Sequence, residues 1–128
     1  DTLRLAGTQM SLDLTHITDL ALRLQSIEKV DLGDATAHNS LTLDAASVLA
    51  LGASGVFNDT TFAGGLGAVV GRTQLVIDGG AASVLHLDGA WVESNVTLSR
   101  AGATYAVYDS ADTLAQLIVN TDLTRDLG

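Results

Sequence analysis

The sequence predicts an all-β domain made of short strands, and two features carry that prediction. Pairs of apolar residues separated by one position recur about every ten residues, and this alternation places both members of a pair on one face of a strand. Turn-forming Gly and Asp follow many of the pairs directly, as in Asp78-Gly79-Gly80 and Asp88-Gly89, which is typical of short strands joined by turns. The pairs are Leu3/Leu5, Leu12/Leu14, Leu22/Leu24, Val30/Leu32, Leu41/Leu43, Leu75/Ile77, Leu85/Leu87, Val96/Leu98, Tyr105/Val107 and Leu117/Val119.

Two architectures fit these strands. The segments SLDLT, IEKVDLGD, NSLTLD, LVIDGG and LHLDG each contain one strand and one turn, which resembles the rungs of a β-solenoid. From Thr73 onward the strands are joined by tight turns, which favour antiparallel neighbours. We therefore expect short strands stacked in solenoid-like rungs that lead into an antiparallel meander, with a β-sandwich as the alternative.

One short helix and one Gly-rich segment interrupt the strand pattern. Asp44 can cap a helix over residues 44–51, where the apolar residues have helical spacing, and Gly52 ends it. A helix this short is stable only when it packs on a sheet, so we expect it to cover an end or an edge. Residues 52–71 contain six glycines and are interpreted as a loop or insertion within a single β module that spans residues 1–128.

The composition excludes several classes of function. The formal net charge is −9, and only six residues are basic, so the chain has no basic patch for a nucleic acid or an anionic membrane. No cysteine is present, which excludes disulfides, thiol catalysis and thiolate zinc sites. No apolar run approaches the length of a membrane span, so we expect a soluble segment without membrane insertion.

Seven segments stand in a characteristic order: residues 26–32, 39–43, 48–51, 75–79, 84–91, 104–108 and 115–119. In this order and spacing they resemble a module of very large bacterial surface and secreted proteins, the adhesins and haemolysin-type (RTX) calcium-binding proteins exported by type I secretion. The resemblance covers nearly the whole chain except residues 53–71. It implies a repeat-bearing protein at the bacterial cell surface or in the extracellular medium, whose partners are neighbouring modules of the same polypeptide.

The chain departs from the calcium-binding repeat that accompanies such modules. That repeat requires Gly-Gly-x-Gly-x-Asp in tandem. The nearest approach, residues 55–67, has Phe57 where a Gly is required and one residue too many before the next Gly pair. We therefore expect no calcium roll within this chain.

Calcium is still a candidate ligand of the Asp-containing turns. Thirteen of the fifteen acidic residues are Asp, and Ca²⁺ takes six to eight oxygen ligands, many of them from carboxylates and main-chain carbonyls. The competing interpretation is that these Asp side chains only close turns. The candidate ligands are Asp78, Asp88, Asp109 and Asp112.

Two aromatic residues, Trp91 and Tyr108, are candidates for binding a surface glycan, because flat rings stack on sugars. Tyr105 and Tyr108 have opposite parity on one strand, which predicts that one points inward and the other outward. The alternative is that Trp91 and one tyrosine belong to the core.

Nothing in the sequence indicates an enzyme. His16, His38 and His86 occur among many Ser and Asp residues, but no nucleophile elbow, His-Glu-x-x-His motif or Gly-Lys-Ser/Thr phosphate loop is present. We expect an extracellular, non-catalytic structural or adhesive module. The alternatives are a subunit that assembles with copies of itself into a surface layer or filament, through strand edges that no proline protects, and a carbohydrate-binding module.

Overall fold

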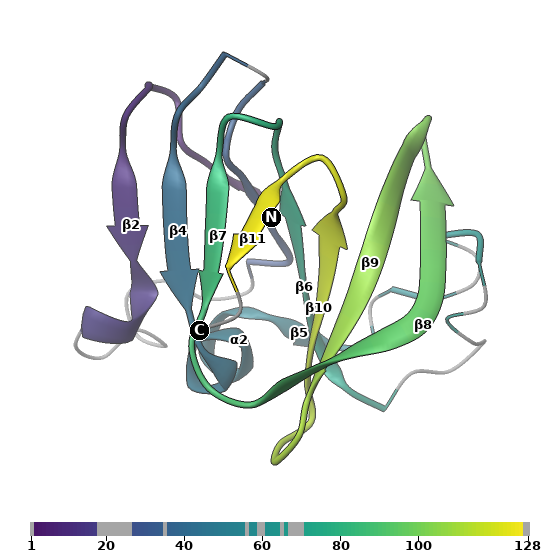
Figure 1. The fold of residues 1–128 in the computed structure, drawn as a ribbon. Coiled ribbons are helices and arrows are strands. Elements are labelled where there is room, and N and C mark those ends of the chain that lie inside the picture. The colour runs from purple at the N-terminus through teal and green to yellow at the C-terminus, as the bar shows by residue number, and fades with distance from the viewer. Residues whose placement is uncertain are drawn as a thin grey trace.

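The chain folds into two β-sheets that pack against each other, as seen in a computed structural model (Figure 1). The structure describes residues 2–17, 27–34, 36–55, 57–58, 61–64, 66 and 71–126. Strands predominate in these residues, so the prediction of a mainly β fold is confirmed. The elements are β1 (Thr2–Arg4), β2 (Ser11–Asp13), the 3₁₀ helix η1 (Leu14–His16), β3 (Lys29–Asp31), β4 (Ser40–Leu43), α2 (Ala45–Leu51), β5 (Ala53–Ser54), β6 (Thr73–Asp78), β7 (Val84–Leu87), β8 (Trp91–Arg100), β9 (Ala103–Ser110), β10 (Ala115–Asn120) and β11 (Thr124–Asp126).

The four-stranded sheet is wholly parallel, whereas the seven-stranded sheet is mixed. The seven-stranded sheet has the order β1-β3-β6-β10-β9-β8, in which the first four strands are parallel and β9 and β8 are antiparallel, while β5 pairs with β6. The four-stranded sheet, β2-β4-β7-β11, is parallel throughout. The predicted antiparallel meander is therefore limited to the pairs β8–β9 and β9–β10. The strands β10 and β11 also pair in parallel, with β6 and β7.

The chain alternates between the two sheets in four passes, each along one strand of the seven-stranded sheet and then one strand of the four-stranded sheet. These passes are β1 to β2, β3 to β4, β6 to β7 and β10 to β11. The helices, β5 and the β8–β9 hairpin all lie in the connections between passes. Within a pass, the second strand begins nine or eleven residues after the first, from Thr2 to Ser11, Lys29 to Ser40, Thr73 to Val84 and Ala115 to Thr124.

The main core lies between the two sheets and is built from rows of aliphatic side chains. In the seven-stranded sheet, parallel register aligns Leu3, Val30, Ile77 and Val119 on four neighbouring strands. Most of the predicted apolar pairs are buried here, and the Leu22/Leu24 pair lies outside the described residues. Ten members of these pairs are fully buried in the main core: Val30, Leu32, Leu41, Leu43, Leu75, Ile77, Leu85, Leu87, Leu117 and Val119.

A second apolar cluster covers the other face of the seven-stranded sheet. It joins Phe57 and Phe62 to side chains of β6, β8, β9 and β10. The segment that carries Phe62 is held by two backbone hydrogen bonds between Ala63 and Ser99 of β8, at 3.0 and 2.7 Å. Because both faces of the sheet are covered, all six residues of β10 are buried, as in strands that are enclosed on both sides.

The short helix α2 forms where the sequence predicts it. Asp44 Oδ1 accepts a hydrogen bond of 2.8 Å from the backbone N–H of Ser47, and the backbone N–H of Gly52 donates to the carbonyl of Val48 at 2.8 Å. Val48 and Leu51 are fully buried in the main core. The helix contacts β6 and β10 and lies at the lower end of the sheets in Figure 1, so it covers an end of the core.

Candidate functional site

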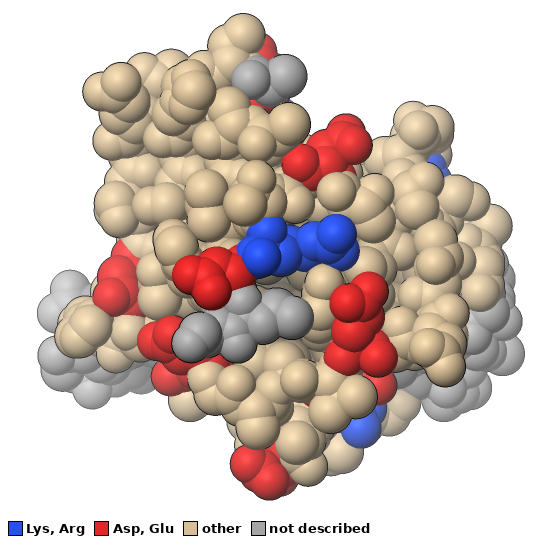
Figure 2. Space-filling model, in the orientation of Figure 1, with Lys and Arg blue, Asp and Glu red and all other residues tan. Residues whose placement is uncertain are grey.

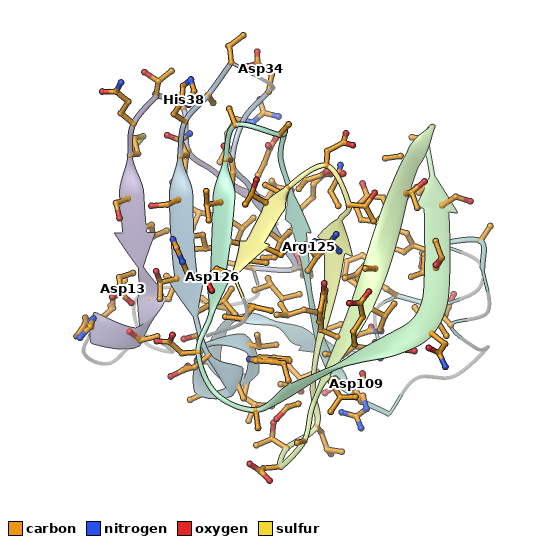
Figure 3. All side chains as sticks on the ribbon, viewed as in Figure 1. Asp13, Asp34, His38, Asp109, Arg125 and Asp126 are labelled. Atoms are coloured by element: carbon orange, nitrogen blue, oxygen red, sulfur yellow. The ribbon has the colours of Figure 1, made fainter. Side chains whose placement is uncertain are left out.

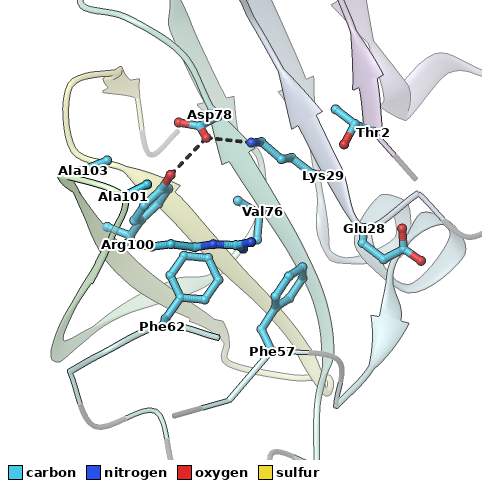
Figure 4. A pocket seen from close by; sticks show the side chains of 11 residues that line it. Thr2, Glu28, Lys29, Phe57, Phe62, Val76, Asp78, Arg100, Ala101 and Ala103 are labelled. Atoms are coloured by element: carbon cyan, nitrogen blue, oxygen red, sulfur yellow. Dashed lines mark hydrogen bonds and ion pairs between the residues drawn. The ribbon is translucent and has the colours of Figure 1, made fainter. Parts of the chain in front are cut away.

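A cleft of about 650 Å³ lies on the outer side of the seven-stranded sheet, where β3, β6 and the β8–β9 turn meet the segment around Phe57 and Phe62 (Figure 4). The register between β3 and β6 determines which of their residues reach the cleft. Lys29 is aligned with Val76, and Asp31 with Asp78, so alternate residues of β3 and β6 face the same side. The cleft is lined by Thr2, Glu28, Lys29, Phe57, Phe62, Val76, Asp78, Arg100, Ala101, Ala103 and Tyr105.

Three aromatic rings form one wall of the cleft. The ring centroids of Phe57 and Phe62 are 5.6 Å apart at an interplanar angle of 70°, and those of Phe62 and Tyr105 are 5.1 Å apart at 78°. Such edge-to-face contacts are favourable. The Arg100 guanidinium lies 5.3 Å from the Phe62 ring centroid, in cation–π geometry. The wall is therefore both apolar and positively charged.

Asp78 is the polar centre of the cleft. Its Oδ2 lies 3.0 Å from Lys29 Nζ and accepts a hydrogen bond of 3.0 Å from the Tyr105 hydroxyl, and its Oδ1 accepts one of 2.7 Å from Asn120 Nδ2. The Asp78 side chain is only 19% exposed. These three donors come from β3, β9 and β10, so one carboxylate joins four strands of the seven-stranded sheet.

The same contacts fix the protonation states of the cleft. Burial acts to raise the pKa of Asp78, but the hydrogen bonds from Asn120, Lys29 and Tyr105 outweigh it and the pKa is lowered. Burial, together with the negative charge of Asp78, raises the pKa of Tyr105 to about 12. At neutral pH Asp78 is thus a carboxylate and Tyr105 a neutral phenol. Neither group is poised to exchange a proton near neutrality.

No three of the four Asp residues predicted to bind calcium gather at one site. Asp78 is engaged by three donors, whereas Asp109 Oδ1 accepts a hydrogen bond of 2.9 Å from Gln116 Nε2. Asp88 and Asp112 are exposed. Within the part of the chain that the structure describes, no three acidic or histidine side chains gather as a metal site would require. Figure 3 likewise shows Asp13, Asp34, Asp109 and Asp126 at separate places.

The structure corrects the prediction for the two tyrosines. Tyr105 and Tyr108 do face opposite sides of β9, but both are buried, at 5% and 2% exposure, because each face of the sheet is covered. Tyr108 therefore lies in the main core, as the alternative interpretation expects for one of the tyrosines. Trp91 is partly buried against the main core, and its Nε1 donates a hydrogen bond of 3.0 Å to the carbonyl of Asp88.

Several charged side chains outside the cleft form isolated pairs. His86 Nδ1 lies 3.1 Å from Asp126 Oδ2, and His16 Nδ1 lies 2.6 Å from Asp13 Oδ2. None of these side chains lines the cleft. On the face seen in Figure 2, acidic side chains are scattered, and the most prominent basic group lies where Figure 3 labels Arg125.

Sequence reasoning missed the cleft because its residues are distant along the chain. Phe57 was notable in the sequence only as a departure from the calcium repeat, and the structure places it in the second apolar cluster. The scarcity of aromatic residues was the one available signal, since Phe57, Phe62 and Tyr105 are three of only five.

Comparisons with protein-family models, with curated proteins and with solved structures found no match to the chain. No helix among the described residues has both the length and the apolar character needed to cross a bilayer. The geometry of the chain itself therefore carries the functional argument.

Proposed function

We propose that the chain is an extracellular, non-catalytic structural or adhesive module of a bacterial surface or secreted protein, built as a stack of solenoid-like coils. The proposal rests on one observation. The chain passes four times from the seven-stranded sheet to the four-stranded sheet, and the strands of these passes pair in parallel within each sheet. Stacked repeats of this kind bury a continuous core and extend in one direction. Such a framework suits a protein whose task is to space or present a surface.

Buried polar side chains that join successive passes support the stacking. Asn39 is 1% exposed, and its Nδ2 donates to the carbonyls of Gly7 and Leu32 at 2.9 and 2.8 Å. Its Oδ1 accepts from the backbone N–H of Met10 at 2.9 Å. In the next pass, the Ser83 hydroxyl donates to the carbonyl of Ala37 at 2.8 Å. Fully satisfied buried networks of this kind fix one arrangement of the backbone.

The protonation states in the cleft support a non-catalytic role. The Asp78 carboxylate and the Tyr105 phenol are bonded to each other and to neighbouring strands, so their contacts stabilise the sheet. A panel of ester, glycoside and phosphate reporter substrates should show no turnover. Turnover that disappears in the Asp78→Asn variant would contradict the proposal.

The absence of cysteine permits a direct test of the coil register. The Ser40 hydroxyl lies 3.2 Å from the Ser11 hydroxyl, on neighbouring strands of the first two passes. A Ser11→Cys/Ser40→Cys variant should form an intramolecular disulfide on oxidation, because the two Cβ atoms are adjacent. The matched control, Ser11→Cys/Val84→Cys, places the thiols two strands apart and should not. Equal cross-linking of both variants would overturn the stacked arrangement.

Calcium binding and surface location belong to the same proposal and rest on the acidic composition and the resemblance to RTX adhesins. A melting curve with calcium and then with a chelator tests the first. A large shift would place calcium at Asp turns, and an unchanged curve would leave packing as the source of stability.

Self-assembly is the second candidate function. It is favoured by the edge strands of the first pass, β1 and β2, where the rows of aligned core side chains end. Leu3 and Leu12 are only partly buried, whereas Val30 and Leu41, their neighbours in register, are fully buried. A second copy that pairs with these edges would complete the rows. Sedimentation at increasing concentration checks this, and a monomer at every concentration, with and without calcium, counts against it.

A further inference from the structure

We propose that the cleft beside Arg100 binds a ring-shaped carboxylate, such as the uronic acid unit of an acidic polysaccharide, and so gives the module its adhesive ligand. This inference rests on the proposed adhesive function and names the site and the ligand class that would serve it. The volume of about 650 Å³ lies within the range of ligand pockets.

Arg100 supplies the recognition of the carboxylate. Among the described residues, no carboxylate lies within ion-pair distance of its guanidinium, which is exposed and held against the Phe62 ring at 5.3 Å. A guanidinium presents two parallel N–H groups that match the two oxygens of a carboxylate. Stacking on Phe62 orients this fork before a ligand arrives, which lowers the cost of ordering on binding.

Lys29 supplies a second positive charge in the same cleft. Its Nζ lies 3.0 Å from Asp78, and its side chain is 38% exposed, so the ammonium group still has N–H groups that can reach a ligand. Figure 4 shows the side chains of Lys29 and Arg100 reaching into the cleft from opposite sides. The lining of this cleft has two cationic side chains and two acidic ones, Glu28 and Asp78, whereas the other principal cleft among the described residues has one cation, Arg4, and four acidic side chains.

The remaining lining favours a ring over a simple ion. Val76 and Phe57 provide apolar surface beside the two cations, and Thr2 adds a hydroxyl to the lining. A pyranose ring has apolar C–H faces and hydroxyl edges, so a uronic acid can use the apolar surface, the hydroxyl and the cations together. The net charge of −9 disfavours anions in general, so binding requires these local groups.

The test is an ¹H–¹⁵N NMR titration of the full chain with three probes. Sodium glucuronate is the charged sugar, glucose is its neutral counterpart, and cyclohexanecarboxylate is a ring carboxylate without hydroxyls. We expect glucuronate to shift the Arg100 Nε–H signal and the backbone amides of residues 28–29, 76–78 and 100–105 in a saturable way. Glucose should bind at least about tenfold more weakly, because it lacks the charge-assisted hydrogen bonds.

Variants show whether the cleft residues are responsible. Arg100→Gln should weaken glucuronate binding about tenfold or more, and Arg100→Lys should retain only part of the affinity because the planar fork is lost. The matched control is Arg4→Gln, which removes an exposed arginine outside the cleft lining and should leave affinity within about twofold.

Three outcomes would overturn the inference. These are saturable shifts located elsewhere or absent, equal weakening by Arg100→Gln and Arg4→Gln, or equal binding of glucose and glucuronate. Tight binding of cyclohexanecarboxylate with no binding of glucuronate would support a ring carboxylate and overturn the glycan as its source. The disulfide test of the coil register is independent of all these results, so failure of the ligand site is distinguishable from failure of the proposed function.

Discussion

Arg125 Nη1 donates a hydrogen bond of 3.0 Å to the hydroxyl oxygen of Tyr108, which ties the last strand of the four-stranded sheet to β9 of the seven-stranded sheet. Arg125 is aligned with Leu85, and Leu85 with Leu41, so it stands in a row whose other members face the main core. The row of leucines ends in a cation at the edge strand β11. The end of the core at the last pass is therefore closed by a polar pair.

Replacing Arg125 by Leu should promote self-association. The leucine would continue the apolar row to the unpaired edge of β11, where exposed apolar edges favour pairing between chains. Sedimentation velocity of Arg125→Leu should show a larger associated fraction than the parent protein at the same concentration. Arg125→Gln is the matched control, since it removes the charge and keeps a polar end, and it should behave like the parent. Equal sedimentation of the leucine variant and the parent would contradict the role of Arg125 as a polar end cap.

Both tyrosines should resist ionisation at pH 10. Burial and the charge of Asp78 raise the pKa of Tyr105 to about 12, and burial raises the pKa of Tyr108. A raised phenol pKa contributes stability that is fully present below the unfolded pKa of about 10 and is lost as the pH rises toward 12. Since the chain has only two tyrosines, absorbance of tyrosinate at alkaline pH reports on both directly.

The control for this titration is the chain in urea, where both tyrosines should ionise near pH 10. Unfolding should accompany ionisation of the native protein as the pH rises above 10. If half of the tyrosine signal ionises near pH 10 without unfolding, one of the two phenols is not held as the structure describes.

Asp78 should contribute measurable stability that acid removes. Because its folded pKa is lowered, the contribution is present above the unfolded pKa of about 3.9 and is lost as the pH falls through the folded value. Asp78→Asn removes the charge that pairs with Lys29 and should lower the free energy of unfolding at pH 7 by about 1–3 kcal/mol, measured by urea denaturation. Asp88→Asn, at an exposed turn, should change it by less than about 0.5 kcal/mol. Equal effects of the two substitutions would show that Asp78 does not join the strands.

The strands were predictable because each apolar pair obeys one local rule. A strand with one face in a core must alternate, so Leu41/Leu43 and Leu85/Leu87 could be assigned from spacing alone. The helix was equally local, since Asp44 and Gly52 mark its ends. Both signals lie within a few residues of the element that they predict.

The pairing of strands and the cleft could not be predicted in this way. Parity places Tyr105 and Tyr108 on opposite faces, but only contacts with Phe57 and Phe62, more than forty residues earlier, decide that both faces are buried. Parallel pairing depends on where long connections return the chain, and composition does not record this. The cleft needs β3, β6, β9, Phe57 and Phe62 together, so no local pattern indicates it.

Gly64 should be essential for holding the segment that covers the second apolar cluster. Its φ is 140°, and a Cβ at this position would collide with the backbone carbonyl of Thr97 in β8. Gly64→Ala should therefore lower the free energy of unfolding by about 2 kcal/mol or more, by breaking the contact between this segment and β8. Urea denaturation measures the effect.

The matched control for Gly64 is Gly89→Ala. Gly89 also has a positive φ, 96°, but a Cβ there would meet no atom within 4 Å. Gly89→Ala therefore introduces the backbone strain without the collision, and it should lower the free energy of unfolding by about 1 kcal/mol. If the two variants lose the same stability, the close approach of Gly64 to β8 does not matter for folding.

A substitution in the turn between β8 and β9 should stabilise the protein. Ala101 and Gly102 are its two central residues, with φ of 52° and 83°, and Arg100 pairs with Ala103 across it. Two positive φ values define the type I′ hairpin turn, for which Asn-Gly is the preferred sequence, and alanine adopts this region at a cost of about 1–2 kcal/mol. Ala101→Asn should therefore raise the free energy of unfolding by up to about 1 kcal/mol, seen as a higher melting temperature. Gly102→Ala should have the opposite sign, and a loss of stability in Ala101→Asn would show that this turn does not have the geometry that places Arg100 at the cleft.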